Sequence, residues 1–450
     1  MSTRGQAAPR GFADILLSGL AADGGLAMPQ SWPQIEGDFA QMSYADAAYA
    51  VLKPFVGDAF SARDLRADVQ AAYAGFDDPA IAPLTHLGNE RYLLELFHGP
   101  TLAFKDIAMQ VLARLFARAL KKRGGRATIV AATSGDTGSA AIAAFGGLPN
   151  IKLFVLHPEG RVSAVQRLQM TTADFDNVHN IALDGSFDEA QSIVKTLFAD
   201  ESFARDASLV AVNSINFARI AAQIVYFFTA ASQLHAPPVF VVPTGNFGDI
   251  FAGEAAMRMG LPVRGLVAAT NANDILVRAL DGGIYAPGDA RATLSPSMDI
   301  QVASNFERAL FEASGRDADW VRGAMAQFAA TRRLALPPEV LADLRTRYSA
   351  YAVSDDDTLA AIARMHERHG RLIDPHTAVG IAAASLVHTD APVVVLSTAH
   401  PAKFPDAVRQ ACGVGPVLPR RLQDLFEKPE RYETLACDAK IVRAFIASKL

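Results

Sequence analysis

The sequence predicts an α/β protein with a doubly wound, mostly parallel sheet. From residue 126 onward, short apolar runs alternate with helical stretches, and each run is nearly continuous rather than alternating in polarity. Continuous apolar runs are typical of strands that are buried on both faces of a parallel sheet. At 450 residues the chain is long enough for roughly two or three domains with full hydrophobic cores.

The opening part of the chain is expected to contain more helix than strand. Helices are expected at Phe12–Leu20, Tyr44–Phe55 and Ala62–Tyr73. Asp23-Gly24-Gly25 has the composition of a turn. The first strong strand is expected at Arg91–Phe97, immediately before a long periodic helix.

Buried strands and helices are expected to alternate through the rest of the chain. The expected strands are Ala127–Ala132, Ile151–Leu156, Leu209–Val212, Val239–Val242, Val263–Ala269 and Pro392–Ser397. Late helices are expected at Trp320–Phe328, Pro338–Tyr351, Thr358–His369 and Thr377–Leu386.

We expect four segments, although no Pro/Gly/Ser-rich linker marks their boundaries. They are a mixed N-terminal segment (1–90), a smaller α/β domain (91–235), a larger α/β domain (236–415) and a helical tail (416–450).

Composition excludes several classes of function. With 42 Lys and Arg against 47 Asp and Glu, the net charge is −5, and the absence of a long basic run argues against a nucleic-acid partner. Cys412 and Cys437 have neither disulfide-framework nor zinc-ligand spacing, which favours a reducing cytosol and no metal site. We expect no signal peptide and no membrane span, since no apolar segment is long enough.

Lys105 is the candidate reactive amine. It lies at the end of His-Gly-Pro-Thr-Leu-Ala-Phe-Lys, at the start of a periodic helix that Gly124 and Gly125 are expected to end. A side chain in the first turn of a helix can project into a cleft between elements. A lone lysine is more often an ordinary surface residue, so the interpretation depends on the polar loops further along the chain.

The first of these loops follows the strand Ala127–Ala132 and reads Thr-Ser-Gly-Asp-Thr-Gly-Ser before a helix of small residues. A strand, a Gly/Ser/Thr loop and a helix N-terminus together supply N–H groups and a favourable dipole for an anion. The candidate ligands are Ser134, Gly135, Asp136 and Thr137. A simple strand-to-helix turn with a capping serine remains an alternative. The loop is neither a Walker loop nor a dinucleotide fingerprint.

A second loop of this kind follows Val239–Val242, where Gly245, Asn246, Phe247, Gly248 and Asp249 precede a helix. An acidic residue at that position opposes a phosphate unless it is turned away, so Asp249 is also compatible with a simple helix cap. A third loop supplies Ser214, Asn216 and Arg219; an arginine one turn inside a helix can hold an anion bidentately. Its alternative is an Asn216 cap with Arg219 paired to a surface carboxylate.

The last strand leads into Ser-Thr-Ala-His-Pro-Ala-Lys-Phe, which contains Thr398 and a second lysine, Lys403. The alternative there is a helix cap followed by a solvated lysine. His376, at the start of another helix, is more simply a packed or capping side chain. No histidine pair has metallohydrolase spacing.

A reactive lysine, several anion loops at the carboxyl ends of parallel strands, and no metal or nucleotide fingerprint indicate a phosphorylated cofactor that forms a Schiff base, such as pyridoxal 5'-phosphate. On the motifs quoted above, and on Gly19-Leu-Ala-Ala-Asp-Gly-Gly-Leu near the N-terminus, the chain resembles the threonine synthases, which are fold type II pyridoxal-phosphate enzymes. The resemblance spans nearly the whole length. It stops at about residue 415.

The resemblance implies that O-phospho-L-homoserine and water are converted to L-threonine and phosphate, with Lys105 carrying the cofactor. It implies that residues 245–249 bind the cofactor phosphate and that Thr398 bonds the pyridine nitrogen. It places Ser134, Thr137, Ser214 and Arg219 around the substrate's carboxylate and phosphate, without dividing the two anions among them. Asn216 and Lys403 are expected as further substrate contacts.

Two other functions are compatible with these residues. A dehydratase or phospho-lyase on the same scaffold would use Lys105 but would leave Ser214 and Arg219 idle. A non-catalytic ligand-binding protein could also keep the fold. The oligomeric state, monomer or homodimer, does not follow from the sequence.

Overall fold

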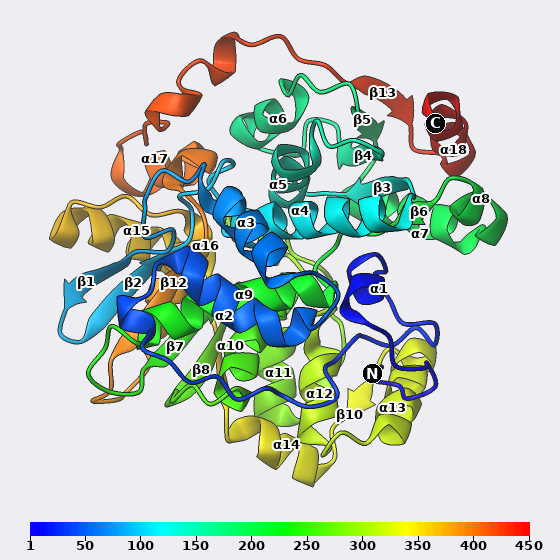
Figure 1. Cartoon of the computed structure of the whole chain (residues 1–450). Coiled ribbons are helices and arrows are strands. Elements are labelled where there is room, and N and C mark those ends of the chain that lie inside the picture. The colour runs from blue at the N-terminus through cyan, green and yellow to red at the C-terminus, as the bar shows by residue number, and fades with distance from the viewer.

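The computed structural model describes all 450 residues and contains two α/β layers with helices on their faces (Figure 1). The larger sheet has the order β1-β2-β12-β7-β8-β11, and the smaller sheet has the order β13-β5-β4-β3-β6. All neighbouring strands in both sheets are parallel, except β1 and β2, which form an antiparallel pair. The predicted α/β class with mostly parallel sheets is confirmed.

The strands of the larger sheet are β1 (Leu84–Gly88), β2 (Arg91–Glu95), β7 (Val239–Pro243), β8 (Gly265–Thr270), β11 (Tyr348–Ala352) and β12 (Val393–Ser397). Those of the smaller sheet are β3 (Ala127–Ala132), β4 (Ile151–Pro158), β5 (Val178–Asp184), β6 (Leu209–Val210) and β13 (Glu433–Ala436). A short separate pair is formed by β9 (Ile284–Tyr285) and β10 (Leu334–Ala335).

The helices of the first half are α1 (Phe12–Leu16), α2 (Tyr44–Val56), α3 (Ala62–Tyr73), α4 (Lys105–Arg123), α5 (Asp136–Phe145), α6 (Ala164–Thr171), α7 (Phe187–Ala199), α8 (Glu201–Asp206) and α9 (Phe217–Ala231). Those of the second half are α10 (Gly248–Arg258), α11 (Ile275–Gly282), α12 (Phe306–Ala313), α13 (Ala318–Thr331), α14 (Pro338–Arg345), α15 (Asp355–His369), α16 (Pro375–Ala384), α17 (Pro405–Cys412) and α18 (Ala439–Lys449). No helix is both long enough and apolar enough to cross a membrane.

Helix α9 lies at the centre of the molecule, between α4 on one side and α2 and α10 on the other (Figure 1). The sequence predicts an amphipathic helix there, but every residue from Phe217 to Ala230 is buried. Neighbours on several sides bury faces that a helix on a single surface would expose. Each large apolar side chain buried in this way contributes roughly 1.5–3 kcal/mol. Arg219, at the beginning of α9, is therefore fixed deep inside the protein.

The N-terminal segment is fastened to the larger α/β layer. The Thr3 hydroxyl and the Arg4 guanidinium both donate to the Glu307 carboxylate, the latter at 2.9 Å. The Trp32 indole N–H donates to Glu312 at 2.9 Å. The apolar side chains of this segment, such as Leu16 and Met28, belong to the main hydrophobic core. The segment thus has no core of its own.

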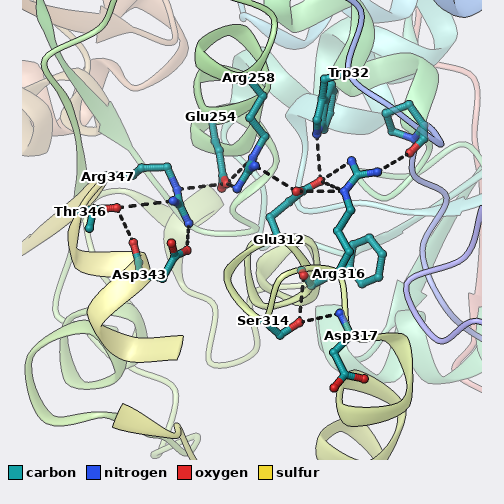
Figure 2. Close-up of polar contacts among 12 residues, drawn as sticks. Trp32, Glu254, Arg258, Glu312, Ser314, Arg316, Asp317, Asp343, Thr346 and Arg347 are labelled. Carbon is teal, nitrogen blue, oxygen red and sulfur yellow. Dashed lines mark hydrogen bonds and ion pairs between the residues drawn. The ribbon is translucent and has the colours of Figure 1, made fainter. Parts of the chain in front are cut away.

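An ion-pair network ties α10, α12 and the region before β11 together (Figure 2). Glu254 on α10 accepts from Arg258 at 2.8 Å and pairs with Arg347 at 3.2 Å. Glu312 on α12 pairs with the same Arg258 at 3.1 Å and with Arg316 at 2.7 Å. Burial raises the pKa of Glu254, and the two arginines beside it oppose that effect. The network fixes the C-terminal part of α10, whose other end carries the predicted phosphate loop.

Two expectations about elements are wrong, and one strand was missed. The strand at residues 91–95 pairs with β12 in the larger sheet, although the sequence division placed it in the smaller domain (91–235). The predicted helix Pro338–Tyr351 ends at Arg345, and β11 follows, because Tyr348–Ala352 pairs in parallel with β8. The strand β5 was not predicted. Pairing partners that are distant in sequence decide such short strands, and a local pattern does not contain them.

The tail is also more than the predicted helical segment 416–450. It contains α18, but β13 precedes this helix and adds an edge strand to β5 of the smaller sheet. Residues 413–432 cross from α17 over the outside of the molecule to reach that sheet (Figure 1). Leu425 packs there against Val165 and Leu168 of α6. The tail therefore connects the larger layer to the smaller one.

Candidate active site

A cavity lies at the carboxyl ends of β7 and β12, where the amino ends of α4, α5, α9 and α10 meet. Open α/β sheets bind their ligands at this edge, because the loops that follow parallel strands converge there. Most of the predicted site residues line the cavity: Lys105, Asp136, Thr137, Ser214, Arg219, Gly245, Asn246, Phe247, Gly248, Asp249 and Thr398. Segments distant in sequence are thus brought together as predicted.

The segment before Lys105 is held in a fixed conformation. The Asp106 carboxylate accepts from the N–H and the hydroxyl of Thr101, both at 2.7 Å. A Cβ atom on Gly99 would lie only 2.4 Å from that of Asp106, so only glycine fits at this position. The N–H of Phe104 donates to the carbonyl of Thr398 at 2.8 Å. These bonds place the first turn of α4, and with it Lys105, against the end of β12.

The Lys105 amine is largely enclosed, with 12% of its side chain exposed, and it donates to Asp136 Oδ2 at 3.2 Å. Burial lowers the pKa of Lys105, and the neighbouring Asp136 opposes that effect. The pKa of Asp136 lies well below its usual value: burial alone would raise it, but Lys105 and Lys403 together outweigh the burial. A buried lysine with a lowered pKa is suited to act as a nucleophile and as a proton carrier.

The loop between β7 and α10 has the properties of a phosphate site. No hydrogen bond within the protein uses the N–H groups of Gly245, Asn246 and Phe247. A Cβ atom on Gly245 would lie 3.1 Å from the carbonyl oxygen of Ser297. A larger residue would therefore force the loop and the Ser297 segment apart. Phe247 has the left-handed backbone conformation, and its buried ring packs against Phe306. The unpaired N–H groups and the N-terminus of α10 together suit a phosphate.

Asp249, in the first turn of α10, is buried beside this loop. One carboxyl oxygen accepts from the Tyr226 hydroxyl, and the other, Oδ2, has no partner. Burial raises the pKa of Asp249 to about 7. A carboxyl group with that pKa is half protonated near neutral pH, so it does not oppose a phosphate as an ordinary aspartate would.

Arg219 is an unpaired cation inside the cavity. Its side chain is buried, and neither Nε nor Nη1 has a hydrogen-bond partner. Burial lowers the pKa of Arg219 to about 10, which leaves the guanidinium charged at neutral pH. The surface ion pair considered as an alternative for this residue is excluded. An uncompensated buried charge is costly, and an anion bound beside it would remove that cost.

Known protein families and structures match the chain over nearly its whole length. The family described as pyridoxal-phosphate dependent enzyme matches residues 80–399, threonine synthase N terminus matches residues 1–73, and threonine synthase C-terminal matches residues 377–446. The chain belongs to the threonine synthase family. A threonine synthase from Pseudomonas aeruginosa is 48% identical over 99% of this chain and 97% of its own length.

Two solved structures of threonine synthases have the same fold over the full chain. The pyridoxal-phosphate-bound enzyme from Brucella melitensis is 50% identical, with a TM-score of 0.97, and the alignment covers 100% of this chain and 98% of that one. The yeast enzyme is 35% identical, with a TM-score of 0.94 and the same coverage. The resemblance, the fold type and the cofactor predicted from the sequence are confirmed. The match to residues 377–446 extends the family likeness into the tail, where the sequence motifs end.

The residues present fit the cofactor of this family. The Lys105 amine lies in the same cavity as the unpaired amides of residues 245–247 and the hydroxyl-bearing Thr398. Thr398 directly follows β12, and its N–H donates to the Thr377 hydroxyl at 3.2 Å. Thr377 in turn donates to Asp374. An amine, an anion loop and a neutral hydroxyl can bind the cofactor's aldehyde, phosphate and ring nitrogen respectively.

Four predicted contacts do not line the cavity. Ser134 and Gly135 lie just before α5, and a Cβ atom on Gly135 would lie only 2.5 Å from the side-chain amide of Gln166. Asn216 is fully buried; it accepts from the Ala218 N–H and donates to the Leu16 carbonyl at 3.0 Å. The capping role considered for Asn216 therefore exists in the structure. Lys403 is also fully buried, so the solvated lysine considered for it is excluded.

The cavity includes residues that the sequence interpretation missed or left as structural. Gln223 lies one turn after Arg219 on α9, and a polar residue at that spacing in an apolar helix is a signal that could have identified it. Ser297 and Met298 belong to a short 3₁₀ helix, η2 (Pro296–Met298), whose sequence contains no motif. His376 also lines the cavity; its Nδ1 is 2.7 Å from Asp374, and its Nε2 accepts from the Ser297 N–H at 3.2 Å. This histidine therefore holds η2 against the site.

Proposed function

We propose that this protein converts O-phospho-L-homoserine and water into L-threonine and phosphate. The observation that carries the proposal is the unpaired, buried Arg219 guanidinium, which is a second anion site in the cavity besides the loop at residues 245–249. The cofactor has one phosphate, and this substrate adds another. A substrate without a phosphate leaves the second site without a ligand.

In this proposal the two substrate anions bind to different elements. The N-terminus of α5, where Thr137 lines the cavity, binds the carboxylate. Arg219 and Ser214 bind the phosphate, together with Asn246, because the Ser304 hydroxyl bonds both Ser214, at 3.1 Å, and Asn246, at 3.0 Å. Arginine suits a phosphate because its planar guanidinium can donate two parallel hydrogen bonds.

Lys105 has two roles in the reaction. It first links the cofactor to the protein, and after substrate has displaced it, its amine moves protons at Cα and Cβ of the substrate. When bound, pyridoxal phosphate supplies an electron sink for the negative charge that these proton transfers create. Phosphate departs from Cγ, and water adds at Cβ. The Thr398 hydroxyl, being neutral, would hold the ring nitrogen of the cofactor without adding a charge beside it.

The test is a direct assay of products. The wild-type holoenzyme should release threonine and inorganic phosphate in equal amounts from O-phosphohomoserine. Deamination of threonine without turnover of O-phosphohomoserine would overturn the proposal in favour of a dehydratase. Binding of pyridoxal phosphate without turnover of either substrate would favour a non-catalytic ligand-binding protein.

We further propose that the protein works in the cytosol as a monomer or homodimer. Two free cysteines, Cys412 and Cys437, are compatible with a reducing compartment. Light scattering on the purified holoenzyme distinguishes the two oligomeric states.

A further inference from the structure

The Lys403 ammonium is fully buried behind the wall of the cavity. Its Nζ donates to the carbonyl oxygen of Thr101 at 2.8 Å and lies 2.8 Å from Asp136 Oδ1. None of the Lys403 side chain is exposed, and the residue does not line the cavity. A substrate phosphate therefore has no direct access to this cation.

Asp136 lies between two lysines. Its Oδ1 faces Lys403 and also accepts from the Gln166 amide at 2.8 Å, whereas its Oδ2 accepts from Lys105 at 3.2 Å. One carboxylate thus pairs with the Lys105 amine through one oxygen and with the Lys403 ammonium through the other.

The charge of Lys403 limits how strongly Asp136 stabilises the ammonium form of Lys105. A carboxylate paired with Lys105 alone would hold the amine as an ammonium ion, which is neither a nucleophile nor a base. Lys403 neutralises the same carboxylate and repels a second positive charge. The two influences are opposite: Asp136 raises the pKa of Lys105, while Lys403 lowers it.

We propose that Lys403 is a positioning residue that neutralises Asp136 and so keeps the Lys105 amine available as a nucleophile and a base. The inference rests on the proposed role of Lys105 but not on the identity of the substrate. Lys403 acts through Asp136 and touches neither cofactor nor substrate.

Other charged groups face the same amine or its partners, and they are unchanged in the Lys403 and Asp136 variants compared below. They are Arg219 from α9, Asp249 from α10, Asp106 from α4 and His376 from α16. None of them contacts Lys403 through a hydrogen bond.

The experiment measures how fast the cofactor-free protein captures pyridoxal phosphate on Lys105 as a function of pH. Capture is followed by absorbance and by borohydride trapping with mass spectrometry, so the readout does not depend on turnover. Because only the neutral amine reacts, the midpoint of the profile reports the pKa of Lys105. Lys403→Met should move the midpoint up by about one pH unit or more. Asp136→Asn should move it down, since two cations then remain without a carboxylate.

The double variant Asp136→Asn/Lys403→Met is the decisive arm. It removes both charges of the pair, so its midpoint should return close to that of the wild type, and its capture rate should exceed that of Lys403→Met at neutral pH. Lys121→Met, the same substitution at an exposed position of α4, should change nothing.

The proposal is overturned if the Lys403→Met midpoint equals that of the wild type while KM for O-phosphohomoserine rises, because Lys403 is then a substrate contact. It is also overturned if the double variant is no better than Lys403→Met. Should Lys403→Met fail to fold, the Asp136→Asn and double variants decide the question by the same measurement. If the wild type captures the cofactor but forms no threonine, the proposed function fails, whereas this comparison remains valid.

Discussion

Two buried cations in the same site, Lys403 and Arg219, have opposite surroundings. The Lys403 ammonium has Asp136 and the Thr101 carbonyl as partners, and none of its side chain reaches the cavity. The Arg219 guanidinium lies in the cavity wall, and two of its nitrogens have no partner. A cation that is satisfied within the protein shapes the site, and a cation left unsatisfied is available for a ligand. Residue type alone does not separate the two roles.

The largest effect is expected at Lys105, whose amine is influenced by both cations. Lys105→Ala removes the only group that can link the cofactor covalently, so the absorbance of lysine-bound cofactor should vanish. Turnover of O-phosphohomoserine should fall by on the order of 10³-fold or more. Absorbance and threonine formation are measured on the same preparation. Retained absorbance in the variant would show that another lysine carries the cofactor.

The second prediction tests whether Arg219 binds the substrate, and it uses the kinetics of an Arg219 variant. Arg219→Met should lower kcat/KM for O-phosphohomoserine by about 100-fold, because charge-assisted hydrogen bonds to a phosphate are worth roughly 3 kcal/mol in total. The affinity for pyridoxal phosphate should change little, since the amides of residues 245–247 are intact. A loss of cofactor with unchanged substrate kinetics would reverse the assignment of the two anion sites.

Substitution of Lys403 and of Arg219 should change the free energy of unfolding in opposite directions. Without ligands, Lys403→Met should lower the free energy of unfolding by about 3 kcal/mol, because it leaves Asp136 with one cation less. Arg219→Met should raise it by about 1 kcal/mol, since an uncompensated buried charge is removed. Thermal unfolding midpoints of the cofactor-free proteins give the signs. Equal shifts in the same direction would contradict the contrast.

The smallest effect is expected at Asp249, and it depends on pH. Its pKa is about 7 in the folded protein, above its ordinary value, so the folded state holds more protons than the unfolded state between about pH 4 and 7. The free energy of unfolding therefore falls as the pH rises through this range. At pH 8 the free energy of unfolding of Asp249→Asn should exceed that of the wild type by about 1–2 kcal/mol, and the gap, measured by thermal unfolding at each pH, should close toward pH 4. A gap that is constant with pH would contradict this origin.

Much of the site could be predicted because its signals are local. Lys105, the loop at residues 245–249 and Thr398 each follow a strand or begin a helix, and the carboxyl ends of parallel strands meet at one edge of the sheet. Gln223 was missed because it lies within a long apolar helix, where no motif marks it. Ser297 was missed because it lies in a short 3₁₀ helix without a recognisable sequence pattern. The placement of β2 and the existence of β13 depend on partners distant in sequence.

By itself, the sequence determined the α/β class and indicated the candidate reactive amine and the candidate anion loops, since periodicity, glycine content and helix ends are properties of neighbouring residues. Only the tertiary structure decided which cation is paired. Lys403 and Asp136 are distant in sequence, and they meet because Lys403, in η3 (Pro401–Lys403) after β12, reaches the carbonyl of Thr101 just before α4, while α5, which begins at Asp136, packs against α4. A buried charge must find its partner wherever packing brings one within reach, so the sequence pattern contains the charges but not their pairing.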